Sequence, residues 1–309
     1  MEKIELVTDE ALEADLARCL SRRRLPDCFL YTGAGGAEKW LTLDGSATFP
    51  IAARLTELLA ASLGDLQKHW GPRHNLVSVG IGSGQKERLI LQEMSRESRR
   101  CYWCVDVSGA LVDIALTAVA DLEVDAIGVV AYMEDLDALK RLWREPVVLC
   151  LLGNNFCNYE PDVLLGAVAE ALGEEDRFLF DCHLLEENDM LNPAYTSGLN
   201  AEFNARPLVA RGLAETGFAF HIALVARQIS VGRTYRTRKW LEIKKESRVA
   251  ADGREIRLRA GEDIEMGFTY KFESGQVEAL LKRCGFCILE QWFSPARENV
   301  LILAVRDHG

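Results

Sequence analysis

The stretch NLVSVGIGSGQKER, residues 75–88, decides the fold of this chain of 309 residues. Asn75 to Val79 is a short apolar run typical of a buried strand, and the glycines of Gly80 to Gly84 follow it directly. A helix is predicted from about Lys86 to Ser98. Glycines here let the backbone approach a ligand closely, and the helix N-terminus offers free N–H groups to a carboxylate or phosphate. A structural turn is the alternative interpretation of the glycines.

The same alternation of strand and helix continues after this unit. Further strands are predicted at Cys101–Val107, Ala126–Val130, Pro146–Leu152 and Arg177–Leu184, with helices at 110–121, 135–143 and 161–172 between them. Strands that alternate with helices in this way predict βαβ units and a parallel sheet covered on both faces.

The C-terminal part has a different order. A helix is predicted at Gly275–Arg283, followed by strands at Phe286–Trp292 and Val300–Val305 whose short connection makes them an antiparallel hairpin. Dinucleotide dehydrogenases are built instead from two parallel βαβαβ halves. A parallel sheet that ends in such a hairpin resembles the class I methyltransferases that use S-adenosylmethionine (SAM), an α/β Rossmann-like fold. This resemblance implies SAM as the cofactor.

Three regions follow from these patterns. Residues 1–70 are expected to form a helical N-terminal segment that contributes to the active site. Residues 71–184 and 273–309 are expected to form the SAM-binding domain. Residues 185–272, which turn polar and then alternate in charged, strand-like sequence with a turn at Asp252-Gly253, are expected to form an inserted α+β substrate cap.

Composition limits the partners. Lys and Arg total 36 against 47 Asp and Glu, and the net charge of −11 repels a phosphate backbone, so we expect a small substrate and no nucleic acid. No run reaches the roughly 18 to 20 apolar residues of a membrane span, and the first residues do not resemble a signal peptide, so we expect a cytoplasmic protein with no membrane partner. The oligomeric state is left open.

The cysteines and histidines do not predict a metal site. Nine cysteines spread through apolar runs are typical of reduced, buried thiols rather than of a disulfide scaffold. The pairs Cys101/Cys104 and Cys284/Cys287 lie in strand-like runs, where the period of two points their members to opposite faces. The five histidines show no HxxxH or HExxH spacing. We therefore expect no metal.

Polar residues at two strand ends form the candidate site. Asp106 ends the second predicted strand, where a carboxylate can accept hydrogen bonds from both hydroxyls of a ribose, with a helix N-cap as the alternative. Asn154, Asn155 and Asn158 follow the fourth strand, at the sheet edge where ligands of open α/β folds bind. A tight turn could account for one of these three asparagines, but three are more than a turn needs.

At this point several segments resemble a known family, the histidine-specific Nα-methyltransferases of ergothioneine biosynthesis. The resemblance runs from about Phe29 to Arg306 in pieces whose order and spacing match together. The matching pieces are Phe29-Leu-Tyr31 with Gly35, Gly80 to Arg88, Val105-Asp-Val107, Leu152 to Asn158, Ala194-Tyr195, Phe203-Asn204 and Gly261 to Phe272.

The resemblance implies roles for individual residues. It implies that Asn158 holds an amino acid's α-amino group, that Tyr195 binds its carboxylate and that Tyr31 faces the site, so that Asn158 and Tyr31 are the candidate catalytic residues. The candidate cofactor-binding residues are Gly80, Gly82, Lys86, Asp106, Tyr132 and Gly153. The candidate substrate-binding residues are Tyr31, Asn155, Asn158, Tyr195, Phe203, Glu265, Gly267 and Thr269.

Departures from the family concern the side chain of the substrate. Gly267 and Thr269 stand where the family uses a Glu and a Ser to grip the histidine imidazole. Thr48-Phe49 replaces paired tyrosines, one of which contacts the imidazole, and Ala131-Tyr-Met133 replaces a segment that contacts adenine. The resemblance therefore implies an amino-acid N-methyltransferase whose substrate differs from histidine.

The side chain of that substrate is open at this stage. Asp263, Glu265 and Gly267 share one strand face by their spacing of two, so an acidic pocket would favour a cationic side chain, arginine first. Methylation of a guanidinium would call for a carboxylate that takes the proton, with Glu265, Asp263 or Glu202 as candidates. Histidine or an aromatic amino acid is the alternative substrate. A catalytically silent SAM-binding relative and a dinucleotide oxidoreductase are the competing functions.

Overall fold

The computed structural model describes residues 2–46, 51–70, 73–94, 101–185 and 198–307. Its largest element is an eight-stranded sheet in the order β1-β5-β4-β3-β6-β7-β15-β14. Its strands are β1 (Glu2–Glu5), β3 (Asn75–Val79), β4 (Cys101–Asp106), β5 (Asp125–Val130), β6 (Val147–Leu151), β7 (Arg177–His183), β14 (Phe286–Phe293) and β15 (Asn299–Arg306). The first six strands of the order are parallel, and β15 and β14 close the edge antiparallel.

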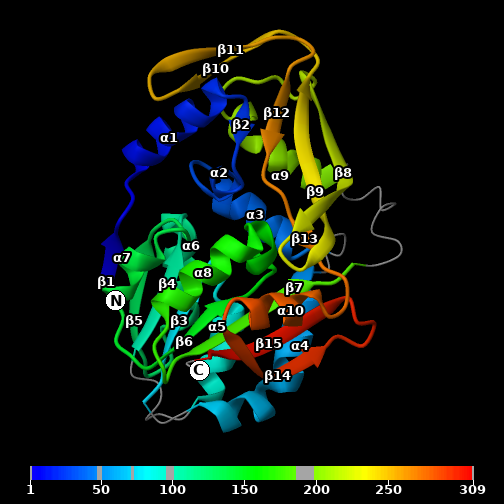
Figure 1. The fold of residues 1–309 in the computed structure, drawn as a ribbon. Helices are drawn as coiled ribbons and strands as arrows, with labels where there is room; N and C mark the ends of the chain where they lie inside the picture. Colours follow the sequence, from blue (N-terminus) through cyan, green and yellow to red (C-terminus); the bar gives the residue numbers. More distant parts are fainter. Residues whose placement is uncertain (1, 47–50, 71–72, 95–100, 186–197, 308–309) are drawn as a thin grey trace.

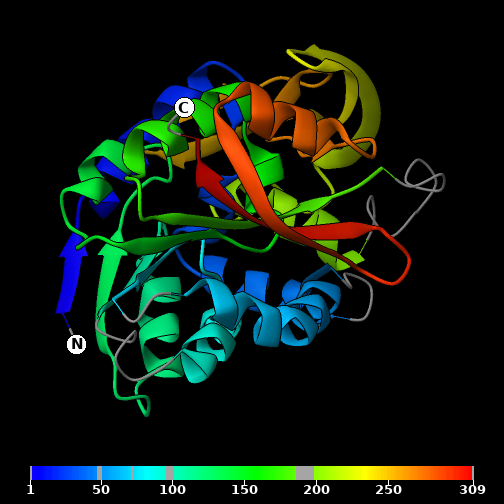
Figure 2. The same cartoon turned by 60° about the horizontal axis from the view of Figure 1, so that its bottom comes forward.

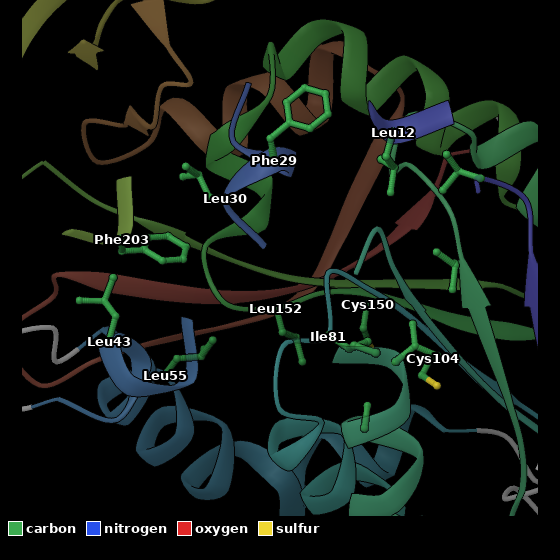
Figure 3. Packing of buried hydrophobic residues seen from close by; sticks show 14 of the residues in the cluster. Leu12, Phe29, Leu30, Leu43, Leu55, Ile81, Cys104, Cys150, Leu152 and Phe203 are labelled. Atoms are coloured by element: carbon green, nitrogen blue, oxygen red, sulfur yellow. The ribbon is translucent and has the colours of Figure 1, made fainter. Parts of the chain in front are cut away.

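Helices cover both faces of this sheet, as Figure 2 shows. One layer holds α4 (Ile51–Leu66), α5 (Gln85–Glu93) and α6 (Gly109–Ala118), and the other holds α7 (Leu136–Lys140), α8 (Pro161–Ala171) and α10 (Gln276–Arg283). The alternation along β3 accounts for the layers, because Leu76 and Val77 are both fully buried but belong to different hydrophobic clusters. Figure 3 shows one of these clusters, in which Cys104 and Cys150 of the sheet lie close to Ile81.

The prediction of a parallel sheet with a C-terminal hairpin is confirmed, and the predicted strand 75–79 coincides with β3. The N-terminal segment differs from the prediction, because it contributes strands as well as helices. β1 joins the edge of the main sheet beside β5, and β2 (Arg24–Leu25) joins a second sheet. Its helices are α1 (Asp9–Ser21), α2 (Cys28–Tyr31), α3 (Gly36–Asp44) and α4, followed by the 3₁₀ turn η1 (Gln67–His69).

The second sheet forms most of the inserted region. Its order is β13-β9-β12-β2, with β8 paired to β9. These strands are β8 (Phe218–Ile229), β9 (Gly232–Ile243), β12 (Asp263–Met266) and β13 (Tyr270–Lys271), preceded by α9 (Gly198–Val209). A separate hairpin of β10 (Ser247–Ala251) and β11 (Arg254–Leu258) turns at Asp252-Gly253, as expected, with positive φ at both residues.

Of the N-terminal helices, Figure 1 shows α2 and α3 above the main sheet and beside the strands of the second sheet. Arg206 of α9 holds this arrangement together, because its buried guanidinium donates hydrogen bonds to the carbonyl oxygens of Phe29, Leu30, Thr32 and Ala34 at 2.6–3.1 Å. Among the described helices, none has the length and apolar character to cross a membrane.

Candidate functional site

A cavity of about 840 Å³ opens where the carboxyl ends of the parallel strands meet α2, α3 and the second sheet. It brings together nearly all of the residues singled out from the sequence. These are Tyr31, Gly80, Gly82, Lys86, Asp106, Tyr132, Gly153, Asn155, Asn158, Phe203, Glu265, Gly267 and Thr269. Tyr195 and the segment Thr48-Phe49 lie outside the described residues.

The glycine loop after β3 closely approaches the turn after β6. Gly80 has φ of 74°, and an ideal Cβ built on it would lie 2.3 Å from the Asn155 amide nitrogen, so only glycine fits. That nitrogen donates hydrogen bonds to the carbonyl oxygens of Gly80 at 2.7 Å, Leu152 at 2.8 Å and Val79 at 3.2 Å. The Asn155 side chain therefore joins the loops after β3 and β6, and its nitrogen is not available to a substrate.

Asp106 is a buried carboxylate at the end of β4, 7% exposed, that faces this cavity. Burial raises its pKa to about 6, although backbone N–H groups of Ser108, Gly82 and Val107 lower it. Ser108 N donates to Oδ1 at 2.9 Å, so the carboxylate anchors the start of α6 as well. A buried carboxylate with unfilled acceptor capacity suits a ligand with two hydroxyl donors.

Opposite charges lie near the loop after β6. The Lys86 ammonium sits 3.7 Å from the position of a Cβ on Gly153, and Asp44 of α3 lines the same cavity. Burial raises the pKa of Asp44, while the charge of Lys86 lowers it. Asp181, also buried, accepts from the N–H groups of Gly153 and Asn154 at 2.8–3.1 Å and fixes this loop. The arrangement can hold an ammonium and a carboxylate together.

The cavity wall formed by the segments after β4 and β5 is mostly apolar, and the Tyr132 hydroxyl is a polar group within it. Val107, Ala131, Met133 and Leu136 line it together with the Tyr132 ring. The Tyr132 hydroxyl donates to Asp15 Oδ2 of α1 at 3.0 Å, so the ring is tied to the N-terminal segment. The segment that replaces the family's adenine contact is thus an apolar surface able to hold a flat base.

All three asparagines line the cavity, but their side chains make different contacts there; Asn158 ends the 3₁₀ turn η2 (Asn155–Asn158). Asn154 adopts the left-handed conformation, with φ of 63°, and its Oδ1 accepts from His183 N at 3.1 Å. Asn158 Oδ1 accepts a hydrogen bond from the Thr269 hydroxyl at 2.9 Å. Two of the three asparagines therefore build the loop, and the third is oriented by the second sheet.

Three aromatic rings form another wall. The centroids of Tyr31 and Trp40 are 5.2 Å apart, and Phe203 lies 5.6 Å from each of them. Burial raises the pKa of the Tyr31 phenol well above its usual value, and the carboxylates of Asp27 and Asp106 add to the rise. Tyr31 therefore stays protonated at neutral pH and can donate a hydrogen bond, but it cannot act as a base.

The acidic face expected on β12 is neutralised. Glu265 accepts from Arg238 of β9 at 2.9–3.2 Å, and Asp263 lies 3.8 Å from the same guanidinium. Both carboxylates are about 43% exposed. Glu202 is paired with Lys39 at 3.7 Å and does not line the cavity. Arg238 and Lys39 therefore already pair with these carboxylates, which weakens the argument for arginine from an acidic face.

A different carboxylate occupies the position opened by Gly267. An ideal Cβ at Gly267 would lie 2.2 Å from Asp27 Cγ and 2.4 Å from both of its oxygens. Both Asp27 oxygens accept from the Lys239 ammonium of β9, at 2.8 and 2.9 Å. No local sequence pattern sets Asp27, Lys239, Trp40 or Asp44 apart, so their place in the site becomes visible only in the structure. Among the described residues no group of three or more metal-ligating side chains is found.

Comparisons with known proteins agree with this geometry. The sequence profile of a family described as histidine-specific, SAM-dependent methyltransferases matches residues 12–306. A histidine N-alpha-methyltransferase from Mycolicibacterium smegmatis (strain ATCC 700084 / mc(2)155) is 28% identical over 270 residues, which cover 83% of this chain and 80% of the relative.

Among solved structures, magnesium protoporphyrin IX methyltransferase from Synechocystis PCC 6803, with bound S-adenosylhomocysteine (SAH), has a TM-score of 0.50 at 11% identity. The match covers 90% of this chain and 96% of that one. Both the SAM methyltransferase fold and SAM as the cofactor are thereby confirmed, and the comparisons favour a methyltransferase over a dinucleotide oxidoreductase. With a match across nearly its whole length, the chain belongs to the family of histidine-specific, SAM-dependent methyltransferases.

Proposed function

We propose that this protein transfers the methyl group of SAM to the α-amino nitrogen of a free L-α-amino acid. The observation that carries the proposal is the hydrogen bond between Thr269 and Asn158, because it orients an amide that lines the cavity in the turn after β6. An oriented amide and a protonated phenol that line the same cavity are suited to an amino acid's polar end.

The cofactor half of the cavity fits SAM. Asp106 would accept the two ribose hydroxyls, which satisfies a carboxylate that burial otherwise penalises. Lys86 would pair with the carboxylate of the methionine part and Asp44 with its ammonium, close to Gly153. Tyr132 and its apolar neighbours would cover the adenine. When bound, SAM supplies an electrophilic methyl group on a sulfonium.

The residues of the other half would hold the acceptor. An amide oxygen has two lone pairs, and Thr269 uses one of them, so Asn158 can still accept an N–H of the α-amine. This directs the nitrogen lone pair along the line of displacement, and such positioning is the main contribution that methyl transfer needs. Tyr31 would donate to the amino acid, and Trp40 and Phe203 would exclude water.

Little acid–base chemistry is required. The α-amine of a peptide has a pKa of about 8, and the carboxylate of a free amino acid raises that value, so fewer than about one molecule in ten are neutral near pH 7. Burial keeps Tyr31 protonated, so it is no candidate for a base. A guanidinium acceptor would demand a free carboxylate base, and the pairing of Glu265 with Arg238 leaves none on β12.

For the side chain, histidine gains support over arginine, which the sequence favoured first. The relative from Mycolicibacterium smegmatis is a histidine N-alpha-methyltransferase. In addition, Asp27 returns a carboxylate to the space that Gly267 vacates. Histidine and arginine are therefore the two diagnostic substrates.

The test is mass spectrometry of products after incubation of the purified protein with SAM and each of the twenty free amino acids. Each methylated amino acid is then tested again as its N-acetyl form and as its methyl ester. Loss of product with the N-acetyl form and a strongly reduced yield with the ester support the proposal. A product formed equally well from the N-acetyl form would overturn it, because the α-nitrogen would then not be the acceptor.

A further inference from the structure

The second sheet brings three residues of distant segments to one point of the cavity wall. β12 lies between β2 and β9, with Met266 opposite Leu25 and Glu265 opposite Trp240. The residues just beyond these pairs, Gly267, Asp27 and Lys239, are consequently neighbours. All three line the cavity.

The Asp27 carboxylate occupies the space that a side chain at position 267 would fill, although it comes from a different segment of the chain. The Asp27 carboxylate lies within 2.4 Å of where a Gly267 side chain would begin, so any larger residue at 267 would collide with it. Its side chain is 18% exposed and that of Lys239 is 14% exposed, and the two are joined at 2.8 Å. The pair is too sheltered to be a solvated surface pair, and it faces the ligand space.

The pair is electrically neutral but strongly polar. A carboxylate has about four acceptor positions and an ammonium three donors, so each partner keeps hydrogen-bonding capacity after the contact between them. A guanidinium offers only donors and brings a positive charge beside Lys239. A carboxylate offers only acceptors and brings a negative charge beside Asp27.

We propose that Asp27 and Lys239 together select the substrate's side chain, accepting a neutral group that carries one hydrogen-bond donor and one acceptor, such as a neutral imidazole or a carboxamide. The donor of the group binds the Asp27 carboxylate and its acceptor binds the Lys239 ammonium. This inference rests on the proposed methylation of a free amino acid and adds the residues that decide which one. Gly267 is required because it leaves room for the pair.

The test compares kcat/KM for histidine, glutamine, arginine, glutamate and leucine in the wild type and three variants. We expect the wild type to prefer histidine or glutamine over arginine and glutamate by at least tenfold. Lys239→Met leaves a lone carboxylate and should raise the ratio of arginine to histidine at least tenfold. Asp27→Asn leaves a lone ammonium and should raise the ratio of glutamate to histidine similarly.

The double variant Asp27→Asn, Lys239→Met removes both charges, so it escapes the cost of one buried, unpaired charge and should turn preference toward leucine. Arg248→Gln is the matched control, since it breaks the exposed pair with Glu255 on the β10–β11 hairpin, and its ratios should equal those of the wild type. Melting temperature and SAH affinity check that each variant is folded.

Substrate ratios that stay within twofold in all three variants would overturn the proposal and leave the pair a structural one. A wild type that prefers arginine would overturn it as well. A wild type that methylates another of the twenty amino acids but none of these five would overturn this inference and leave the proposed function standing. A wild type that binds SAH but methylates none of the twenty contradicts the proposed function itself.

Discussion

The two halves of the cavity differ in how they are built. Apart from Asp44 of α3, the cofactor half comes from segments that follow β3, β4, β5 and β6, so most of its residues are fixed by one sheet. The acceptor half is assembled from α2, η2, α9 and two strands of the second sheet. The first half keeps the glycine loop and Asp106 and changes its adenine segment, whereas in the second half Asp27 of a neighbouring segment occupies the space beside Gly267. A carboxylate can therefore be present at the same place in the cavity although the residue at position 267 no longer supplies it.

The largest expected effect distinguishes the halves directly. Asn158→Ala removes the acceptor that orients the α-amine, and we expect kcat/KM to fall about 100-fold or more, equivalent to about 3 kcal/mol. SAH affinity, measured by calorimetry, should change less than about threefold, because Asn158 belongs to the acceptor half. Loss of both properties together would mean that the halves are not separable.

The converse variant is Asp106→Asn. It replaces a charged acceptor of two hydroxyls, and charge-assisted hydrogen bonds contribute about 2 kcal/mol, so SAH should bind roughly 30-fold more weakly. Asp121→Asn serves as the matched control, because Asp121 is an exposed partner of Arg88 on the surface. Ratios of kcat/KM between amino acids should not move, and a changed substrate preference would contradict the assignment.

The pH dependence follows from the same carboxylate. Burial raises the pKa of Asp106 to about 6, so in the free protein it takes up a proton as the pH falls through about 6 and then loses acceptor capacity. SAH should bind about tenfold more weakly at pH 5 than at pH 7. The stability contribution has the opposite sign, because a raised carboxyl pKa favours the folded state as the pH falls. An affinity that is flat from pH 7 to 5 would show that Asp106 does not bind the ligand as its carboxylate.

Asp181 titrates in the same range, since burial raises its pKa to about 6 as well. The Asp106→Asn variant separates the two carboxylates, because any pH dependence of SAH affinity that remains in it belongs to Asp181 and the loop at Gly153.

The sequence predicts the site residues that directly follow a recognisable strand, but not those brought together by strand pairing between distant segments. The glycine loop, Asp106 and Asn158 follow apolar strands whose bounds periodicity gives closely, so their meeting at one sheet edge is predictable. Asp27 and Lys239 meet only because two-residue β2 pairs with β12, and so short a strand has no periodic signal. The strand β1 was missed for the same reason.

The charge of the β12 face also differs from the prediction. Alternation placed Asp263 and Glu265 on one face correctly, but Arg238 on the next strand neutralises that face, and strand pairing over such a distance is not visible in one sequence.

The smallest effect concerns the orientation of Asn158. Thr269→Val keeps the shape of the side chain and removes the hydroxyl that donates to Asn158 Oδ1, so we expect kcat to fall about fivefold, equivalent to about 1 kcal/mol, with SAH affinity unchanged. Thr269→Ser should restore most of the rate. A serine variant as slow as the valine variant would show that the hydroxyl has no role in orienting the amide.

The most direct measurement of the central claim is the nuclear magnetic resonance spectrum of the product formed from SAM with a ¹³C-labelled methyl group and an amino acid labelled with ¹⁵N only at the α-position. The amino acid is whichever one the mass spectra identify. Our account predicts a one-bond coupling between the transferred carbon and the α-nitrogen. A methyl signal without that coupling would place the methyl on another atom and contradict the account.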